Sequence, residues 1–191
     1  MDTPELPDAA NDPLNRRISI IVALSATFLS ICNIKDGNIV QAMQQAQADG
    51  VDTWSYFQAK STKEHVGLAA VAELTAIEAG MPEGEQKRTV DALLTTWKAD
   101  AAKYEKDKHE VEAKARGFEA RYNALNLRDD QFDMAEATLS LAIALMGITA
   151  LTRQKWLLVV GSIFAAFGCF MGVAGFAEWP FHPNALATFL S

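Results

Sequence analysis

The chain has 191 residues, half of which are apolar, and its formal net charge is −7. A surface that binds nucleic acid needs clustered Lys and Arg, so this acidic balance disfavours nucleic acid as a partner. The apolar residues are segregated: residues 18–34, 137–151 and 156–177 carry almost no charge. Such segregation is typical of a membrane protein, because about 20 apolar residues in a helix span a bilayer core.

The chain begins with a segment, residues 1–15, that combines prolines with acidic residues and predicts a flexible acidic tail. Arg16 and Arg17 come directly before the first apolar stretch, which predicts a transmembrane helix over residues 16–35. The stretch is long and no small-x-small cleavage site follows it, so we expect an uncleaved signal anchor. Gly37, just after it, can break the helix or merely bend it.

The segment of residues 36–133 predicts an extramembrane helical hairpin. In its first arm, side chains at steps of three and four residues form a helical stripe. The stripe consists of Trp54, Phe57, Ser61, His65, Leu68, Ala72 and Thr75. Gly80 suits a helix cap and Pro82 suits the first turn of the next helix, so we place the tip of the hairpin near residues 80–84.

The return arm carries a heptad repeat. Its d positions are Val90, Trp97, Tyr104, Val111, Phe118, Leu125, Phe132 and Leu139. Its a positions are Leu94, Ala101, Lys108, Ala115, Tyr122, Asp129 and Glu136. The repeat predicts one helix from about Pro82 to beyond Leu139 that runs directly into the membrane. Because the two arms have similar lengths, we expect an antiparallel coiled-coil hairpin standing on the bilayer.

The remaining apolar stretches predict two more transmembrane helices, at residues 134–152 and 156–178. Trp156 and Trp179 stand at the two ends of the third helix, where an aromatic belt would place them. Residues 179–191 are too short to span a membrane and are expected at its interface. The expected fold class is therefore all-α and integral to the membrane, with three transmembrane helices and a long hairpin between the first and second.

Basic residues predict the orientation in the membrane. Arg16 and Arg17 flank the first span, and Arg153 and Lys155 lie in the turn between the second and third. A three-span layout puts all of them on one side, and the positive-inside rule makes that side cytoplasmic. The hairpin then projects into the periplasm of a Gram-negative cell. Two basic residues beside the membrane on the hairpin side oppose this assignment.

Small residues recur at helical spacing inside each span. The third span carries Gly161, Ala165, Gly168, Gly172 and Gly175, the second carries Ala137, Ser140, Ala144, Gly147 and Ala150, and the first carries Ala23, Ala26, Ser30 and Asn33. Such stripes let helices approach closely where lipid gives no hydrophobic drive to associate. Two interpretations remain open: packing within one three-helix unit, or contact between subunits. Cys32 and Cys169 also lie in the spans and are expected to be packing residues rather than a disulfide.

Signals for catalysis are weak. Glu105, His109 and Glu112 share one helical face, but they fall on the solvated side of the heptad, where a charged surface is a simpler interpretation than a metal site. The sequence contains no motif of a nucleophilic triad, a phosphate-binding glycine loop or a metalloprotease. We therefore expect no cofactor, no metal and no enzymatic activity.

The most unusual stretch of the hairpin lies at residues 54–65. We expect Tyr56, Lys60 and Lys63 to share a face that points away from the partner arm and could dock another protein. Between an N-terminal span and a closing pair of spans, the stretch Trp-x-Tyr-x-Gln-Ala-Lys-Ser-x-Lys resembles an uncharacterised family of bacterial membrane proteins with a domain of unknown function. The resemblance covers roughly residues 14–178. It implies a bacterial inner-membrane protein with three spans and brings no known activity.

The aromatic rows of the return arm are wider than an Ala-rich partner arm can cover, which predicts self-association into a homo-oligomer. The leading hypothesis is thus a non-enzymatic membrane scaffold or interaction protein, with membrane lipid, further copies of itself and another membrane protein as candidate partners. One alternative is a small oligomeric channel, because backbone and small residues can line a pore. The other is an accessory subunit of a membrane enzyme.

Overall fold

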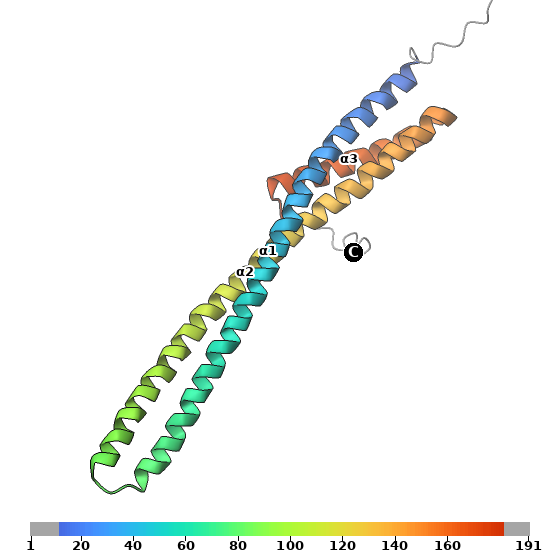
Figure 1. The fold of residues 1–191 in the computed structure, drawn as a ribbon. Helices are drawn as coiled ribbons and strands as arrows, with labels where there is room; N and C mark the ends of the chain where they lie inside the picture. Colours follow the sequence, from blue (N-terminus) through green and yellow to red (C-terminus); the bar gives the residue numbers. More distant parts are fainter. Residues whose placement is uncertain (1–11, 182–191) are drawn as a thin grey trace, which may run out of the picture. The chain divides into compact units, whose positions relative to one another are not determined.

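The computed structural model describes residues 12–181, and three helices make up almost all of this part of the chain. They are α1 (Pro13–Ala79), α2 (Glu85–Thr152) and α3 (Lys155–Ala177), as Figure 1 shows. The described residues contain no strand, so the predicted all-α fold class is confirmed. Each helix is long and apolar enough to cross a membrane. The outer parts of the two predicted tails, residues 1–11 and 182–191, lie outside the described residues.

The chain forms two compact units. The first comprises Met1–Met43 and Asn123–Ser191, of which residues 12–43 and 123–181 are described; we call it the apolar unit. The second comprises Gln44–Tyr122 and is called the hairpin unit.

The first helix begins earlier than the sequence predicted. Pro13 occupies its first turn, where a missing N–H costs nothing, and the Asp12 Oδ1 atom accepts a hydrogen bond of 3.0 Å from the Leu14 N–H. The predicted flexible tail of residues 1–15 is therefore wrong for its last residues, which are helical. The helix also continues without a break through Gly37.

The second helix starts later than predicted, at Glu85 rather than at Pro82. The preceding residues form the turn, in which the Gly80 and Met81 N–H groups donate to the carbonyls of Ile77 and Glu78 at 3.1 and 3.0 Å. These bonds satisfy carbonyls that the end of α1 would otherwise leave open. The acidic residue in the first turn of α2 complements the helix dipole.

In the apolar unit, parts of all three helices enclose large side chains. Those with almost no exposed surface include Cys32, Phe132, Met134, Leu139, Met146 and Met171. The rings of Phe28 and Phe132 both contact Phe176 of α3, with centroids 6.3 and 5.1 Å apart respectively. Three helices can surround such residues on several sides, which is what full burial of a bulky side chain requires.

In the hairpin unit, α1 and α2 lie side by side and antiparallel (Figure 1). The close approaches of Gly50 to Phe118 and of Gly67 to Ala101 join residues whose numbers rise along α1 while they fall along α2. The deepest positions hold small side chains: Ala46, Gly50 and Gly67 of α1 and Ala101 and Ala115 of α2 are all buried. At Gly67 a Cβ atom would lie only 3.4 Å from the Cβ of Ala101, so the two helices approach closely there.

The stripe predicted for the first arm is wrong beyond Ser61. His65, Leu68, Ala72 and Thr75 are exposed, whereas the residues that face α2 are Glu64, Gly67, Val71 and Leu74, which are buried or half-buried. The residues of α1 that face α2 recur every 3.5 residues on average, as the heptad of α2 does. The predicted stripe instead followed the apolar side chains. One of them is charged and one is a glycine, so hydrophobicity alone does not reveal them.

Candidate functional site

The small residues of α3 all face the other helices of the same chain. Gly161, Ala165, Gly168, Gly172 and Gly175 are buried. A Cβ atom at Gly168 would lie 2.6 Å from the Thr138 Oγ1 atom and 2.7 Å from the Leu139 Cγ atom. At Gly172 it would lie 2.6 Å from the ring of Phe28. This stripe therefore packs within one chain, and a larger side chain would push the helices apart.

The small residues of the apolar stretches of α1 and α2 lie elsewhere. Ser140, Ala144 and Gly147 of α2 are exposed, as are Ala23, Ser30 and Asn33 of α1. A Cβ atom at Gly147 would find nothing within 4 Å. Residues between them on α2, such as Ala142 and Met146, make the contacts inside the unit. The α2 stripe is thus an outward face of the apolar unit.

Two polar side chains of α2 hold the end of α3. The Gln131 Nε2 atom donates to the carbonyls of Trp179 and Phe181 at 2.9 and 2.6 Å, and the side chain is fully buried. The Arg128 guanidinium pairs with Glu178 at 2.9 Å. Glu178 has a left-handed backbone, with φ at 56°, and ends the helix without a glycine. The roles of Arg128 and Gln131 were not predicted from the sequence. Their partners are backbone carbonyls and Glu178, which lie about 50 residues further along the chain.

An acidic cluster lies where the first apolar stretch of α1 ends. Asp36 faces Asp129 of α2, and the two carboxyl groups are within hydrogen-bonding reach. Burial, then the negative charges of Asp129 and Asp133, raise the pKa of Asp36 from 3.8 to about 6. Burial also raises the pKa values of Asp129 and Asp133. The pair can therefore share a proton at a pH where an exposed carboxyl is ionised.

Two ion pairs join the arms in the middle of the hairpin unit. The Lys60 Nζ atom lies 2.6 Å from the Asp107 Oδ2 atom, and the Lys108 Nζ atom lies 2.5 Å from the Glu64 Oε2 atom. Lys108 occupies one of the predicted a positions, and its partner is Glu64, at an inward position of α1. Charges at inward positions fix the register of two helices, because a shifted register would leave them unpaired.

The predicted docking face is only partly free. Tyr56 is exposed, and Lys63 lies over the Tyr104 ring, 5.7 Å from its centroid. Lys60, in contrast, points toward α2, where the hydrogen bond from its ammonium group lowers the pKa of Asp107. Its inclusion in an outward face was wrong, because the heptad spacing places it in the contact between the helices.

The predicted seam of α2 is buried unevenly. Its a positions Leu94, Ala101 and Ala115 are buried. Its d positions Val90, Trp97, Tyr104, Val111, Phe118 and Leu125 are only half-buried, and Phe132, which belongs to the apolar unit, is fully buried. The largest side chains of the hairpin unit thus stand at the margin of the helix pair, and the smallest ones at its centre.

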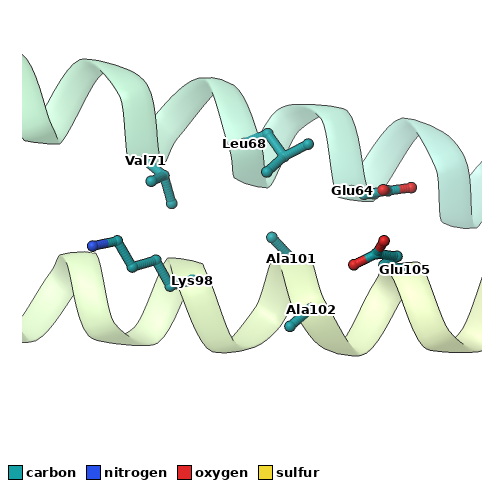
Figure 2. Close-up of a pocket in the computed structure, with 7 residues that line it drawn as sticks. All are labelled: Glu64, Leu68, Val71, Lys98, Ala101, Ala102 and Glu105. Carbon is teal, nitrogen blue, oxygen red and sulfur yellow. The ribbon is translucent and has the colours of Figure 1, made fainter.

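A groove of about 300 Å³ runs beside this seam, and Figure 2 shows it from the side. Its lining residues are Glu64, Leu68 and Val71 of α1 and Lys98, Ala101, Ala102 and Glu105 of α2. Lys98 lies at one end of the groove, and Glu64 and Glu105 lie at the other (Figure 2). His109 and Glu112 were weighed earlier with Glu105. The His109 Nδ1 atom lies 3.8 Å from the Glu112 Oε2 atom. Among residues 12–181, no group of three or more His, Cys, Asp or Glu side chains is arranged to hold a metal ion.

This architecture defines a class of protein in which three helices suited to a membrane are combined with a long helical hairpin. A family model described as a domain of unknown function, DUF4337, matches residues 14–178. The match covers most of the chain, so the protein belongs to this family, and the resemblance drawn from the stretch at residues 54–63 is confirmed. Comparisons with curated proteins and with solved structures found no match.

Proposed function

We propose that this protein is a non-enzymatic scaffold of the bacterial inner membrane, which associates with further copies of itself through its spans and its projecting coiled-coil hairpin. The observation that carries the proposal is the arrangement of side chains in the hairpin unit. Trp97, Tyr104 and Phe118 are only half-buried, while the alanines beside them are fully covered. Large aromatic side chains at the edge of a contact are the kind that dominate protein interfaces.

The spans offer a second surface for association. The exposed stripe of Ser140, Ala144 and Gly147 lies on the outside of the apolar unit. Its small side chains do not serve close contact between helices of the same chain. In lipid, a stripe of this kind permits close contact between helices. It therefore supports an assembly that is held together inside the membrane as well as outside it.

A cytoplasmic N-terminus and a periplasmic hairpin complete the proposal. One ion pair supports it: the Arg153 Nη2 atom lies 3.6 Å from the Asp12 Oδ2 atom, so the start of α1 and the turn between α2 and α3 lie at the same end of the apolar unit. Arg16 and Arg17 at the start of α1 and Arg153 and Lys155 at the turn then lie on the same side of the membrane. By the positive-inside rule this side is the cytoplasmic one. The exposed Trp156 and Trp179 mark the two ends of α3, as an aromatic belt would.

Mass photometry of the full chain in a mild detergent, over a range of concentrations, tests the proposal. We expect discrete oligomers, and Ala144→Leu should shift the distribution toward the monomer without changing helical content. Ile163→Ala, at an exposed position of α3 and so outside the stripe, is the control and should leave the distribution unchanged. A single monomeric species at every concentration would contradict the proposal.

A further inference from the structure

The charged side chains of the apolar unit gather at its two ends, because residues 18–34, 137–152 and 156–177 carry no charge. At the end where α1 begins and α2 turns into α3, basic side chains outnumber acidic ones by four to one, and we call it the basic end. It consists of Asp12, Arg16, Arg17, Arg153 and Lys155. At the other end, acidic side chains outnumber basic ones by six to two. They are Asp36, Asp129, Asp130, Asp133, Glu136 and Glu178, against Lys35 and Arg128. The described part of the unit thus carries opposite net charges on the two sides of an apolar stretch.

The basic end is assembled from two segments that are far apart in the chain. The Arg153 guanidinium lies 3.6 Å from the Asp12 carboxylate, which places the start of α1 beside the turn between α2 and α3. The Arg153 side chain is still 64% exposed, and an exposed pair of this kind is weak, so the guanidinium stays open to a second anion. Arg16, Arg17 and Lys155 are also exposed and form no ion pair with any residue between 12 and 181. Together these side chains form one surface that attracts anions.

Large apolar side chains directly adjoin these charges. Leu151 is 87% exposed, Trp156 is 61% exposed and Ile20 is 52% exposed. A soluble anion would neutralise the basic side chains but would leave this apolar surface in water. A phospholipid meets both needs, since its phosphate pairs with the cations while its acyl chains cover the apolar side chains. A tryptophan at the junction of the two surfaces is typical of the headgroup level of a membrane.

We propose that the basic end binds the phosphate groups of anionic phospholipids, whose acyl chains lie along the adjoining apolar residues. The inference rests on the proposed placement of the chain in a membrane, but not on its self-association. The acidic residues at the other end of the unit repel the same lipids, so the enrichment is confined to one leaflet. In the proposed orientation this is the cytoplasmic leaflet, where basic residues beside a span are attracted by anionic headgroups.

Competition between two lipids tests the inference. The full chain, freed of lipid in mild detergent, is mixed with equal amounts of phosphatidylglycerol and phosphatidylcholine that have the same acyl chains. Native mass spectrometry then counts the copies of each lipid on the protein. We expect phosphatidylglycerol to be preferred, even though the acidic residues Asp2, Glu5 and Asp8, which lie outside the described residues, are present in every sample. Equal binding of the two lipids would overturn the inference, while the proposed scaffold is judged separately by the oligomeric state.

Neutral variants locate the preference. Lys155→Gln should lower it by up to about fivefold at low salt, and the fourfold variant R16Q/R17Q/R153Q/K155Q should remove it. Lys35→Gln is the matched control, because it changes the net charge of the chain equally but lies at the acidic end. If K35Q lowers the preference as much as K155Q, or if the fourfold variant retains it, the inference is wrong.

Free phosphate separates the lipid from a soluble anion as the ligand. Inorganic phosphate at the same concentration as the lipids should displace little phosphatidylglycerol, because it has no acyl chains to cover the apolar residues. Displacement of most of the bound phosphatidylglycerol would show a site for soluble anions and would overturn the assignment to lipid.

Tryptophan fluorescence in vesicles gives the position of the bound lipid independently. The two exposed tryptophans of the apolar unit mark its two ends, Trp156 the basic end and Trp179 the acidic one. Two chains are compared, each retaining one of these tryptophans and carrying phenylalanine in place of the others. Phosphatidylglycerol with brominated acyl chains, diluted into phosphatidylcholine, should quench Trp156 more strongly than Trp179. The difference should disappear when the bromine is carried by phosphatidylcholine, and equal quenching of both tryptophans by the brominated anionic lipid would contradict the inference.

Discussion

The apolar unit and the hairpin unit are built from parts of the same two long helices, yet they bury different kinds of side chain. The apolar unit adds α3 and encloses Phe132, Leu139 and Met171 completely. The hairpin unit has only two helices, and apart from Leu94 and Glu64 its buried positions hold alanine and glycine, while Trp97 and Phe118 are half-buried. Two cylinders touch along one line, so they can cover small groups on that line but not large ones beside it.

This difference shows how each unit obtains its register. In the apolar unit, register follows from shape, since each glycine of α3 fits against a particular side chain. In the hairpin unit, an alanine seam would tolerate sliding, and the ion pairs Lys60–Asp107 and Glu64–Lys108 define one alignment instead. Shape complementarity and charge pairing thus perform the same task in two environments.

The largest effect is expected when the shape-based register is disturbed. Gly168→Ala should lower the free energy of unfolding by about 2–3 kcal/mol, because the new Cβ atom would overlap Thr138 and Leu139. Gly147→Ala, where the added atom meets open space, should be neutral or stabilise by up to about 1 kcal/mol. Equilibrium unfolding of both variants in mixed micelles, followed by circular dichroism, measures the two values. Equal effects would mean that α3 does not depend on close approach at Gly168.

A smaller effect is expected when the charge-based register is disturbed. Glu64→Leu leaves the Lys108 ammonium group largely buried without its partner, and should cost about 1–2 kcal/mol. The double variant E64L/K108L should recover most of this loss, since two apolar side chains replace the pair. Glu110→Leu removes an exposed partner of Lys106 at 3.9 Å and should change stability by less than about 0.5 kcal/mol. If the double variant is as unstable as E64L, the Glu64–Lys108 pair stabilises the fold by more than neutralising the buried charge of Lys108.

The smallest effect is expected at the acidic cluster of the apolar unit. Folded Asp36 holds its proton more tightly than an unfolded one, since its pKa is raised from 3.8 to about 6. Its favourable contribution is therefore complete below about pH 4 and is lost as the pH rises through about 6. Asp36→Asn should stabilise the protein at pH 7.5 by about 1 kcal/mol, a value reduced because the carboxyl is only partly buried.

At pH 4 the same substitution should have little effect, because Asp36 is then protonated and neutral like asparagine. Thermal unfolding of the wild type and of D36N at both pH values supplies the comparison. The double variant D36N/D129N should gain little beyond D36N, since removal of one charge already relieves the repulsion between the carboxyls. An equal gain for D36N at both pH values would rule out proton binding as its cause.

Much of the fold follows from local patterns in the sequence. The three apolar stretches predict the helices suited to a membrane, and the heptad of α2 predicts a long uninterrupted helix. The first arm of the hairpin was harder, because Glu64 and Gly67 face α2 for reasons that lie in α2 itself. Similarly, the stripes of Gly168 and of Gly147 look alike in sequence, and only the positions of the neighbouring helices separate the packed one from the exposed one.

The candidate sites were less accessible to sequence reasoning than the fold. The Asp36–Asp129 pair brings together residues on different helices, and a pattern along one helix cannot reveal it. Gln131 binds backbone carbonyls, which every residue possesses, so no sequence signal marks it. For Lys60 the pattern was misleading, because its positive charge suggests a solvated face whereas Asp107 stabilises it in the contact between the helices.

The five-residue turn between Ala79 and Glu85 also governs the order in which the hairpin unit assembles. Pairings near the turn close short loops, while those far from it close long ones: 44 residues separate Glu64 from Lys108, and 65 separate Trp54 from Glu119. Closing the longer loop first would cost only about 0.3 kcal/mol more, but each pairing formed near the turn makes the next one local. We therefore predict that the pairings form in order from the turn outward. Refolding rates should thus respond to Val71→Ala, near the turn, and unfolding rates to Trp54→Ala, at the far end.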